Sequence, residues 1–146
     1  MGKITLYHGT SESSAQNIQK YGINFNLGSG ELGQGFYLGT SIAYASCMAW
    51  HAAQKNNDSK FHVLSVTIEV DDLKKWNVLS FNNWGAERKW NELIKTNQTK
   101  TYLFNKDVVI SPVQDGLNMG CWQFKFEKDV NPKLKIKIFR SYEQRK

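Results

Sequence analysis

The stretch Glu31-Leu32-Gly33-Gln34-Gly35-Phe36-Tyr37-Leu38-Gly39-Thr40 is the part of the sequence on which the fold prediction rests. Glycines this dense mark a backbone that takes positive φ or lets another group approach closely. Phe36-Tyr37-Leu38 is a short apolar run between glycines, which predicts a short strand. Two interpretations are open: a structural hairpin, or a strand that presents an aromatic ring to a flat ligand.

A second stretch, Leu6-Tyr7-His8-Gly9-Thr10, lies near the start of the chain. Alternation predicts a strand that places His8 on the same face as Ile4 and Leu6, and we expect Gly9 to end it. Two roles are open for His8. It either packs at the rim of the core, or its ring donates or accepts a hydrogen bond at a site where the backbone is unobstructed.

Together the two stretches resemble the ADP-ribosyltransferase superfamily, on the side of the poly(ADP-ribose) polymerases and diphtheria toxin. These proteins carry a strand ending in His-Gly-Thr or His-Gly-Ser, then Gly-x-Gly-x-Tyr, then a helix. The matching segments here are His8-Gly9-Thr10, Gly33-Gln34-Gly35-Phe36-Tyr37 and a helix expected to open at Thr40-Ser41. The motif Asp-Phe-Gly-x-Gly-Phe-Tyr-Leu, common in a small bacterial branch of the superfamily, is closer still to residues 31–38 of this chain. The resemblance runs from about residue 4 to 139 and is poor over residues 56 to 120.

The third motif residue of the superfamily is a glutamate that opens a late strand. The matching position here is Gln123, within Cys121-Trp122-Gln123-Phe124-Lys125-Phe126, and the small bacterial branch tolerates glutamine or aspartate there. Gln123 is therefore either the third site residue or an exposed polar strand residue. Asp115 is the rival candidate, although Asp115-Gly116 is also an ordinary turn dipeptide.

The resemblance implies an α+β fold with two packed, mainly antiparallel sheets around a central NAD cleft, a few flanking helices, and one domain over residues 1 to 146. It implies a mono-ADP-ribosyltransferase of the toxin or effector type, which transfers ADP-ribose from NAD to a macromolecular target without a metal. Tyr37 would stack on nicotinamide, Gly9 backbone groups would hold its amide, and His8 would bind the adenosine ribose. The NAD-binding set comprises His8, Gly9, Thr10, Gly35, Tyr37 and Tyr44, and the catalytic set His8, Tyr37 and Gln123.

Three departures from the superfamily pattern keep a second interpretation open, a catalytically inert module that binds NAD or ADP-ribose. Gln123 can accept a hydrogen bond from a ribose hydroxyl but supplies no negative charge. Losing one well-placed electrostatic group costs on the order of a hundredfold to a thousandfold in rate. Where the polymerases carry a serine and a second stacking tyrosine, this chain has Ala45 and Met48.

Composition and charge point to a folded domain with anionic partners. The chain has 146 residues, 40% of them hydrophobic, and a net charge of +6. NAD and nucleic acid are both anions, so a basic nucleic-acid-binding domain is a further alternative. The basic residues of the last quarter favour a solvated strand face with a charged tail, because Lys135 and Lys137 alternate with apolar residues. These residues are Lys125, Lys128, Lys133, Lys135, Lys137, Arg140, Arg145 and Lys146.

Localisation is expected to be cytoplasmic, with no membrane partner. The start of the chain shows no signal-peptide pattern, and no apolar run is long enough to cross a membrane. Cys47 and Cys121 are expected to be free thiols in a reducing compartment and belong to no metal-ligand cluster.

The remaining sequence predicts several helices and strands. We expect helices over 11–22 and 86–95 and from Ser41 onward, strands over 63–70, 78–81, 107–112, 121–126 and 134–139, and a Gly-rich flap over 23–30. In the helix after Ser41, one face carries Tyr44, Cys47, Met48, His51 and Ala52. Tyr44 and Trp50 are each expected either to pack in the core or to border the ligand.

Overall fold

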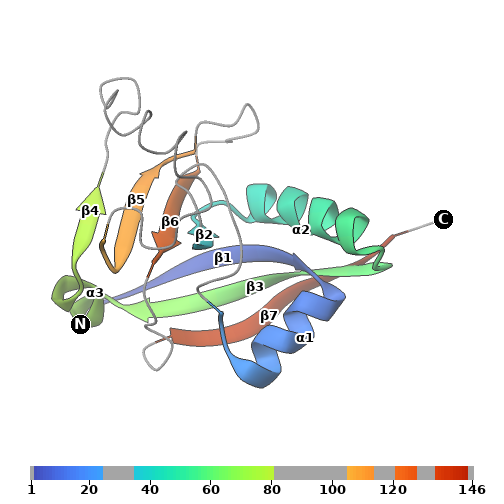
Figure 1. Ribbon diagram of the computed structural model, residues 1–146, viewed down its shortest axis with the longest axis horizontal. Helices are drawn as coiled ribbons and strands as arrows, with labels where there is room; N and C mark the ends of the chain where they lie inside the picture. Colours follow the sequence, from blue (N-terminus) through green and yellow to red (C-terminus); the bar gives the residue numbers. More distant parts are fainter. Residues whose placement is uncertain (1, 25–34, 81–104, 114–120, 128–133, 145–146) are drawn as a thin grey trace.

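The computed structural model describes residues 2–24, 35–80, 105–113, 121–127 and 134–144. These residues form an α+β fold, as the sequence predicts (Figure 1). The elements in chain order are β1 (Lys3–Ser11), α1 (Glu12–Tyr21), β2 (Phe36–Gly39), α2 (Ile42–Asn56), β3 (Lys60–Glu69), α3 (Val70–Lys75), β4 (Val78–Ser80), β5 (Val108–Pro112), β6 (Trp122–Phe126) and β7 (Leu134–Glu143).

The described strands form one seven-stranded sheet in the order β4-β5-β6-β2-β1-β3-β7. All neighbours are antiparallel except β4 and β5, which are parallel. The expected division into two separate sheets is not confirmed, because β1 and β2 are joined through the pair Tyr7↔Gly39. Figure 1 nevertheless shows two arms: β4, β5 and β6 run in a different direction from β1, β3 and β7. The single pair between β1 and β2 is the seam between these arms.

The main hydrophobic core brings the two arms together. β1 and β3 contribute Leu6, Val66 and Ile68, whereas β2 and β6 contribute residues that include Leu38 and Phe126. Each of these five side chains is at most 2% exposed. Burying a side chain of this size contributes roughly 1.5–3 kcal/mol, so the core holds both sides of the seam in place.

Strand β3 is buried on both faces over much of its length, which differs from the half-buried strand predicted over 63–70. Val63, Leu64, Val66 and Ile68 are all fully buried, and Ser65 is only 2% exposed. The reason is its central position in one arm: it lies between β1 and β7, and both α1 and α2 also contact it.

Helix α2 begins where the sequence predicts, with the Ser41 side chain accepting a hydrogen bond from the Tyr44 N–H at 3.1 Å. Its C-cap is Asn57, which has a left-handed backbone with φ of 57°. Its buried residues are the alanines Ala45, Ala49 and Ala53, which lie toward the sheet. Trp50 does not pack in the core, because it is 46% exposed, and it is not among the residues that line the cavity described below.

The alanine face of α2 explains Gly9. A Cβ atom on Gly9 would lie 1.7 Å from the Ala45 carbonyl oxygen and 2.6 Å from the Ala49 nitrogen. The strand therefore does not stop at Gly9 but passes under the helix and continues to Ser11. Gly9 is required because strand and helix backbones approach each other closely here.

Lys125 corrects the interpretation of the basic residues as a uniformly solvated surface. Its side chain is fully buried and lies 2.5 Å from the equally buried Glu127 carboxylate. Burial lowers the pKa of the Lys125 amine, and the Glu127 carboxylate opposes that shift. Lys135, Lys137 and Arg140 on β7 are exposed, as predicted.

Several predictions fall outside the described residues: the helix over 86–95, the flap from residue 25 onward, Gly33, Gln34 and Asp115. Within the described part of the chain, no helix is both long and apolar enough to span a membrane.

Candidate functional site

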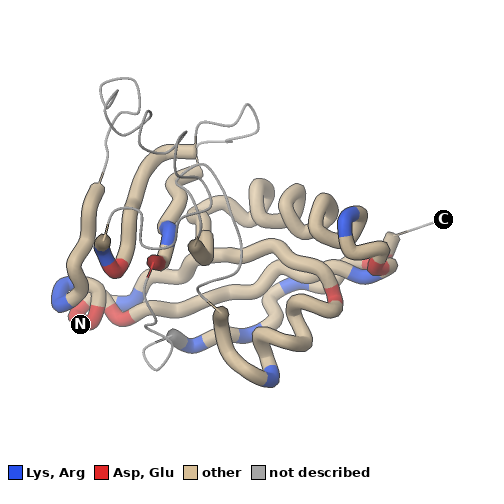
Figure 2. Tube along the Cα trace, viewed as in Figure 1, with Lys and Arg blue, Asp and Glu red and all other residues tan. Residues whose placement is uncertain are grey.

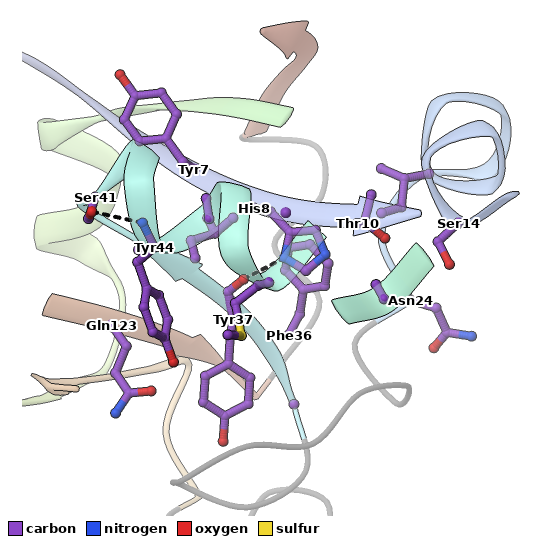
Figure 3. Close-up of a pocket in the computed structure, with 18 of the residues that line it drawn as sticks. Tyr7, His8, Thr10, Ser14, Asn24, Phe36, Tyr37, Ser41, Tyr44 and Gln123 are labelled. Carbon is purple, nitrogen blue, oxygen red and sulfur yellow. Dashed lines mark hydrogen bonds between the residues drawn. The ribbon is translucent and has the colours of Figure 1, made fainter. Parts of the chain in front are cut away.

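A cavity of about 920 Å³ opens beside the seam, between α1 and α2 (Figure 3). Its volume is in the range typical of small-molecule sites, roughly 300–1,000 Å³. Every residue of the predicted site that the structure describes lines this cavity. They come from three strands and one helix, and one of them directly precedes β2. These residues are His8, Gly9, Thr10, Gly35, Tyr37, Tyr44 and Gln123.

A hydrogen bond joins the two sequence stretches inside this cavity. His8 Nδ1 lies 2.8 Å from the Tyr37 carbonyl oxygen. A carbonyl oxygen only accepts, so Nδ1 carries the proton and, in a neutral ring, Nε2 is an acceptor. Burial lowers the pKa of His8 from 6.5, and the bond to Tyr37 only partly opposes this, so the ring is neutral at pH 7. The His8 ring also packs against Phe36, with centroids 4.3 Å apart.

The labelled side chains form two groups within the cavity (Figure 3). Tyr37, Tyr44 and Gln123 lie together at one end, and their polar tips point in the same general direction. Thr10 lies toward the other end with Ser14 and Asn24, and the His8 and Phe36 rings lie between the groups. One end is thus largely aromatic, and the other carries small hydrogen-bonding side chains.

The interpretation of Gln123 as an exposed strand residue is wrong. Gln123 is 6% exposed and lines the cavity. Its Nε2 donates to Ser111 Oγ at 3.1 Å and to the Pro112 carbonyl at 3.4 Å. Strand β6 aligns Gln123 with Gly39 on one side and Ser111 on the other. The β5 contacts fix how the amide is turned within the cavity.

The helices contribute residues that the motifs do not contain. Tyr44, Met48 and Ala52 belong to the predicted face of α2, and they line the cavity at a spacing of one helical turn. Cys47 and His51 from the same predicted face are not among the lining residues. From α1 come Ser14, Asn17, Ile18 and Tyr21. This helical spacing is the one signal in the sequence that could have identified them.

The two residues that replace superfamily side chains, Ala45 and Met48, also line the cavity. Their positions therefore border the same space as Tyr44. Cys47 and Cys121 are both free cysteines. Among the residues that the structure describes, no three His, Cys, Asp or Glu side chains gather as a metal site.

Comparison with known families adds one finding. Residues 4–123 match the family described as "Protein of unknown function (DUF3990)". The chain belongs to the DUF3990 family. The match begins in β1 and ends at Gln123, so it spans all the residues that bring the cavity's two groups together. No curated protein matches this DUF3990 chain.

Proposed function

We propose that this protein is a mono-ADP-ribosyltransferase that takes ADP-ribose from NAD and transfers it to a macromolecule. The observation that carries the proposal is the convergence of His8, Tyr37 and Gln123, from strands β1, β2 and β6, on one cavity. The three residue types match the order of the superfamily motifs, with glutamine in place of glutamate. In this account the two arms of the sheet form the walls of an NAD cleft.

The aromatic end of the cavity is suited to nicotinamide. Tyr37 and Tyr44 both line this end, and either ring face can stack on a flat heterocycle. Gly9 also lines the cavity, so its backbone groups border the same space. We assign the nicotinamide ring to Tyr37 and its amide to the Gly9 backbone.

The other end is suited to the adenosine ribose. In neutral His8, Nδ1 donates its hydrogen bond to the Tyr37 carbonyl. Nε2 is therefore the atom that accepts a hydrogen bond from a ribose hydroxyl. Thr10 and Ser14 add hydroxyl groups to the same region of the cavity. Because the ring stays neutral, this contact does not depend on pH near neutrality.

The reaction breaks the bond between the ribose C1′ and the nicotinamide nitrogen. The bonding electrons stay with that nitrogen, and nicotinamide leaves as a neutral base while positive charge develops on the ribose. A nucleophile of the acceptor bonds to C1′ and loses its proton to solvent. Gln123 accepts a hydrogen bond from the 2′-hydroxyl, which orients the ribose without adding negative charge. We therefore expect slow transfer, because charge-assisted hydrogen bonds are about twice as strong as neutral ones.

A second candidate is an inert module that binds NAD or ADP-ribose. The observation that favours it is the anchoring of Gln123: its amide nitrogen is bonded to Ser111 and Pro112, as expected of a structural residue. In that case the cavity would bind NAD but leave the nicotinamide bond intact.

Transfer is tested by incubating the protein with cell lysate and NAD labelled on its adenylate phosphate. Label should become bound to macromolecules, and separate protease and nuclease digestions would identify the acceptor class. Tyr37→Ala should abolish labelling, whereas the matched variant Tyr37→Phe should retain it. Saturable NAD binding without labelling or nicotinamide release would favour the inert module, and the absence of both binding and turnover would contradict the proposal.

A further inference from the structure

A basic and aromatic surface lies on the sheet face that carries α2. We propose that this surface binds a single-stranded nucleic acid. We call it the β7 surface and define it by Tyr7, Lys135, Lys137, Phe139 and Arg140. Because the proposed function needs a macromolecular acceptor, the inference rests on it in one respect: the bound strand would be that acceptor.

The strand register places basic and aromatic residues side by side. Tyr7 aligns with Ser65 on β3, and Ser65 aligns with Lys137 on β7. Side chains in one such row share a face of the sheet. Lys135 lies two residues before Lys137 and therefore on the same face. Figure 2 shows Lys and Arg positions recurring along β7.

A β-bulge adds Phe139 to this face. On β3, Leu64 pairs with Ile138 of β7, whereas the preceding residue, Val63, pairs with Arg140. Phe139 therefore has no partner on β3 and is the extra residue of the bulge. The Phe139 ring centroid lies 5.3 Å from that of Tyr7. The Arg140 guanidinium carbon lies 5.4 Å from the Phe139 centroid, on the same face. The bulge therefore interleaves aromatic rings with the basic side chains, which strand alternation alone does not predict.

The β7 surface is open to a ligand. Phe139 is 41% exposed, a large value for a hydrophobic side chain, and Lys135, Lys137 and Arg140 are exposed too. Within the described residues, neither Lys135 nor Lys137 forms an ion pair, and the Glu69 carboxylate is paired with Lys3 at 3.8 Å. The lysine charges are thus available to an anion.

Unpaired bases fit this surface better than a duplex. Base stacking on exposed rings needs bases that are free of a double helix. Aromatic platforms flanked by cationic side chains are the usual means of holding single strands without strict sequence preference. The Arg140 guanidinium packs on Phe139 and also interacts with the Tyr142 hydroxyl, and its remaining N–H donors can bind a phosphate.

The β7 surface also adjoins the cavity, because Tyr7 belongs to both. Figure 3 shows the Tyr7 ring pointing away from Tyr37 and Gln123. A strand stacked on Tyr7 and Phe139 would therefore pass next to the cavity that we assign to NAD. The acceptor nucleophile would then come from a strand bound along β1, the strand that carries His8.

Binding of an oligonucleotide in the absence of NAD tests the β7 surface independently of the proposed NAD reaction. Fluorescence anisotropy of a labelled short single-stranded RNA, its DNA counterpart and the matching duplex would be measured without NAD, at about 50 and 200 mM salt. We expect tighter binding of a single strand than of the duplex. Phe139→Ala should weaken single-strand binding by about fivefold to a hundredfold, the loss of one stacked base, and Phe139→Tyr should restore it.

Charge is tested with a matched pair of variants. Lys135→Gln/Lys137→Gln should weaken binding and reduce the salt slope by about 1.4, which corresponds to two phosphate contacts. The control Lys74→Gln/Lys75→Gln removes the same charge from exposed positions on α3. It should change neither the affinity for the single strand nor the salt slope by much. The inference is overturned if neither oligonucleotide binds, if the duplex binds equally well, or if both lysine pairs behave alike. Transfer to protein that is unaffected by Phe139→Ala would also overturn it and point to a protein acceptor.

Discussion

The His8 imidazole and the Tyr37 carbonyl, 29 residues apart in the sequence, are joined by a 2.8 Å hydrogen bond. This bond crosses from β1 to β2 beside the seam, where the strands pair only at Tyr7 and Gly39. It therefore sets both the tautomer of His8 and the position of the backbone that carries the Tyr37 ring.

The lowered pKa of His8 predicts a pH dependence of stability. Below pH 6.5 the unfolded chain protonates His8 before the folded protein does, so the free energy of unfolding should fall as pH decreases from 6.5 toward the folded pKa. His8→Gln should reduce this dependence. Denaturant unfolding of both proteins between about pH 5 and 7.5 would measure it. An unchanged pH slope in His8→Gln would show that His8 is not held neutral.

Tyr37 is predicted to act through its ring face. Tyr37→Ala should weaken NAD binding strongly while the fold persists, because Tyr37 is only partly buried and lines the cavity. Tyr37→Phe should have a mild effect, since stacking does not need the hydroxyl. Calorimetric titration with NAD and circular dichroism would separate binding from folding. If Tyr37→Ala unfolds the protein and Phe does not preserve NAD binding, the residue is structural.

Gly9 is predicted to be essential for folding as well as for the site. In Gly9→Ala the added carbon would lie 1.7 Å from the Ala45 carbonyl oxygen, so helix α2 must shift. We expect a loss of about 3 kcal/mol or more in the free energy of unfolding. Gly2→Ala is the control, because the nearest atom to its added carbon is a Val70 methyl at 3.4 Å. Equal stability of the two variants would contradict the close helix–strand packing.

The buried pair of Lys125 and Glu127 is predicted to be sensitive to the loss of one partner. Glu127→Gln leaves the Lys125 amine buried without its counter-charge and should destabilise the protein by about 3–5 kcal/mol. Glu69→Gln breaks the exposed Lys3–Glu69 pair and should cost about 0–1 kcal/mol. Urea unfolding of both variants would test this. Similar small losses would show that water reaches Lys125.

Local patterns in the sequence predict most of the elements and the meeting of the two stretches. Alternation identified β1, β3 and β7, and Ser41 identified the start of α2. The order of the motifs also predicts that His8 and Tyr37 share a site, and both line one cavity. These features depend on residues close together in the chain, where side-chain periodicity and capping are informative.

Features that depend on tertiary packing were not predictable in the same way. The sequence predicts that Gly9 ends a strand, because it does not show that α2 packs against the strand there. The sequence predicts that Lys125 is solvated, because it does not show that the Lys125 and Glu127 side chains are both buried. The bulge at Phe139 shifts register without any glycine to mark it, so the aromatic content of the β7 surface emerged only with the structure.

Gln123 is predicted to affect rate more than NAD affinity. Gln123→Glu adds a negative charge where positive charge develops, so the rate of nicotinamide release should hold or rise. The variant loses the Nε2 bonds to Ser111 and Pro112, so we expect about 1 kcal/mol lower stability. Gln123→Ala should lower the rate at nearly unchanged NAD affinity. Equal rates in all three proteins would remove Gln123 from the site and leave Asp115 as the candidate, to be tested with Asp115→Asn.

Release of free nicotinamide from NAD is the direct measure of the cleavage that we assign to the cavity. Chromatography would quantify nicotinamide formed by the parent protein, Gln123→Glu and Tyr37→Ala, with NAD binding measured in parallel. We predict slow release by the parent, equal or faster release by Gln123→Glu, and none by Tyr37→Ala. If none of the three releases nicotinamide faster than NAD in buffer does, and the parent does not bind NAD, the cavity is not an NAD site.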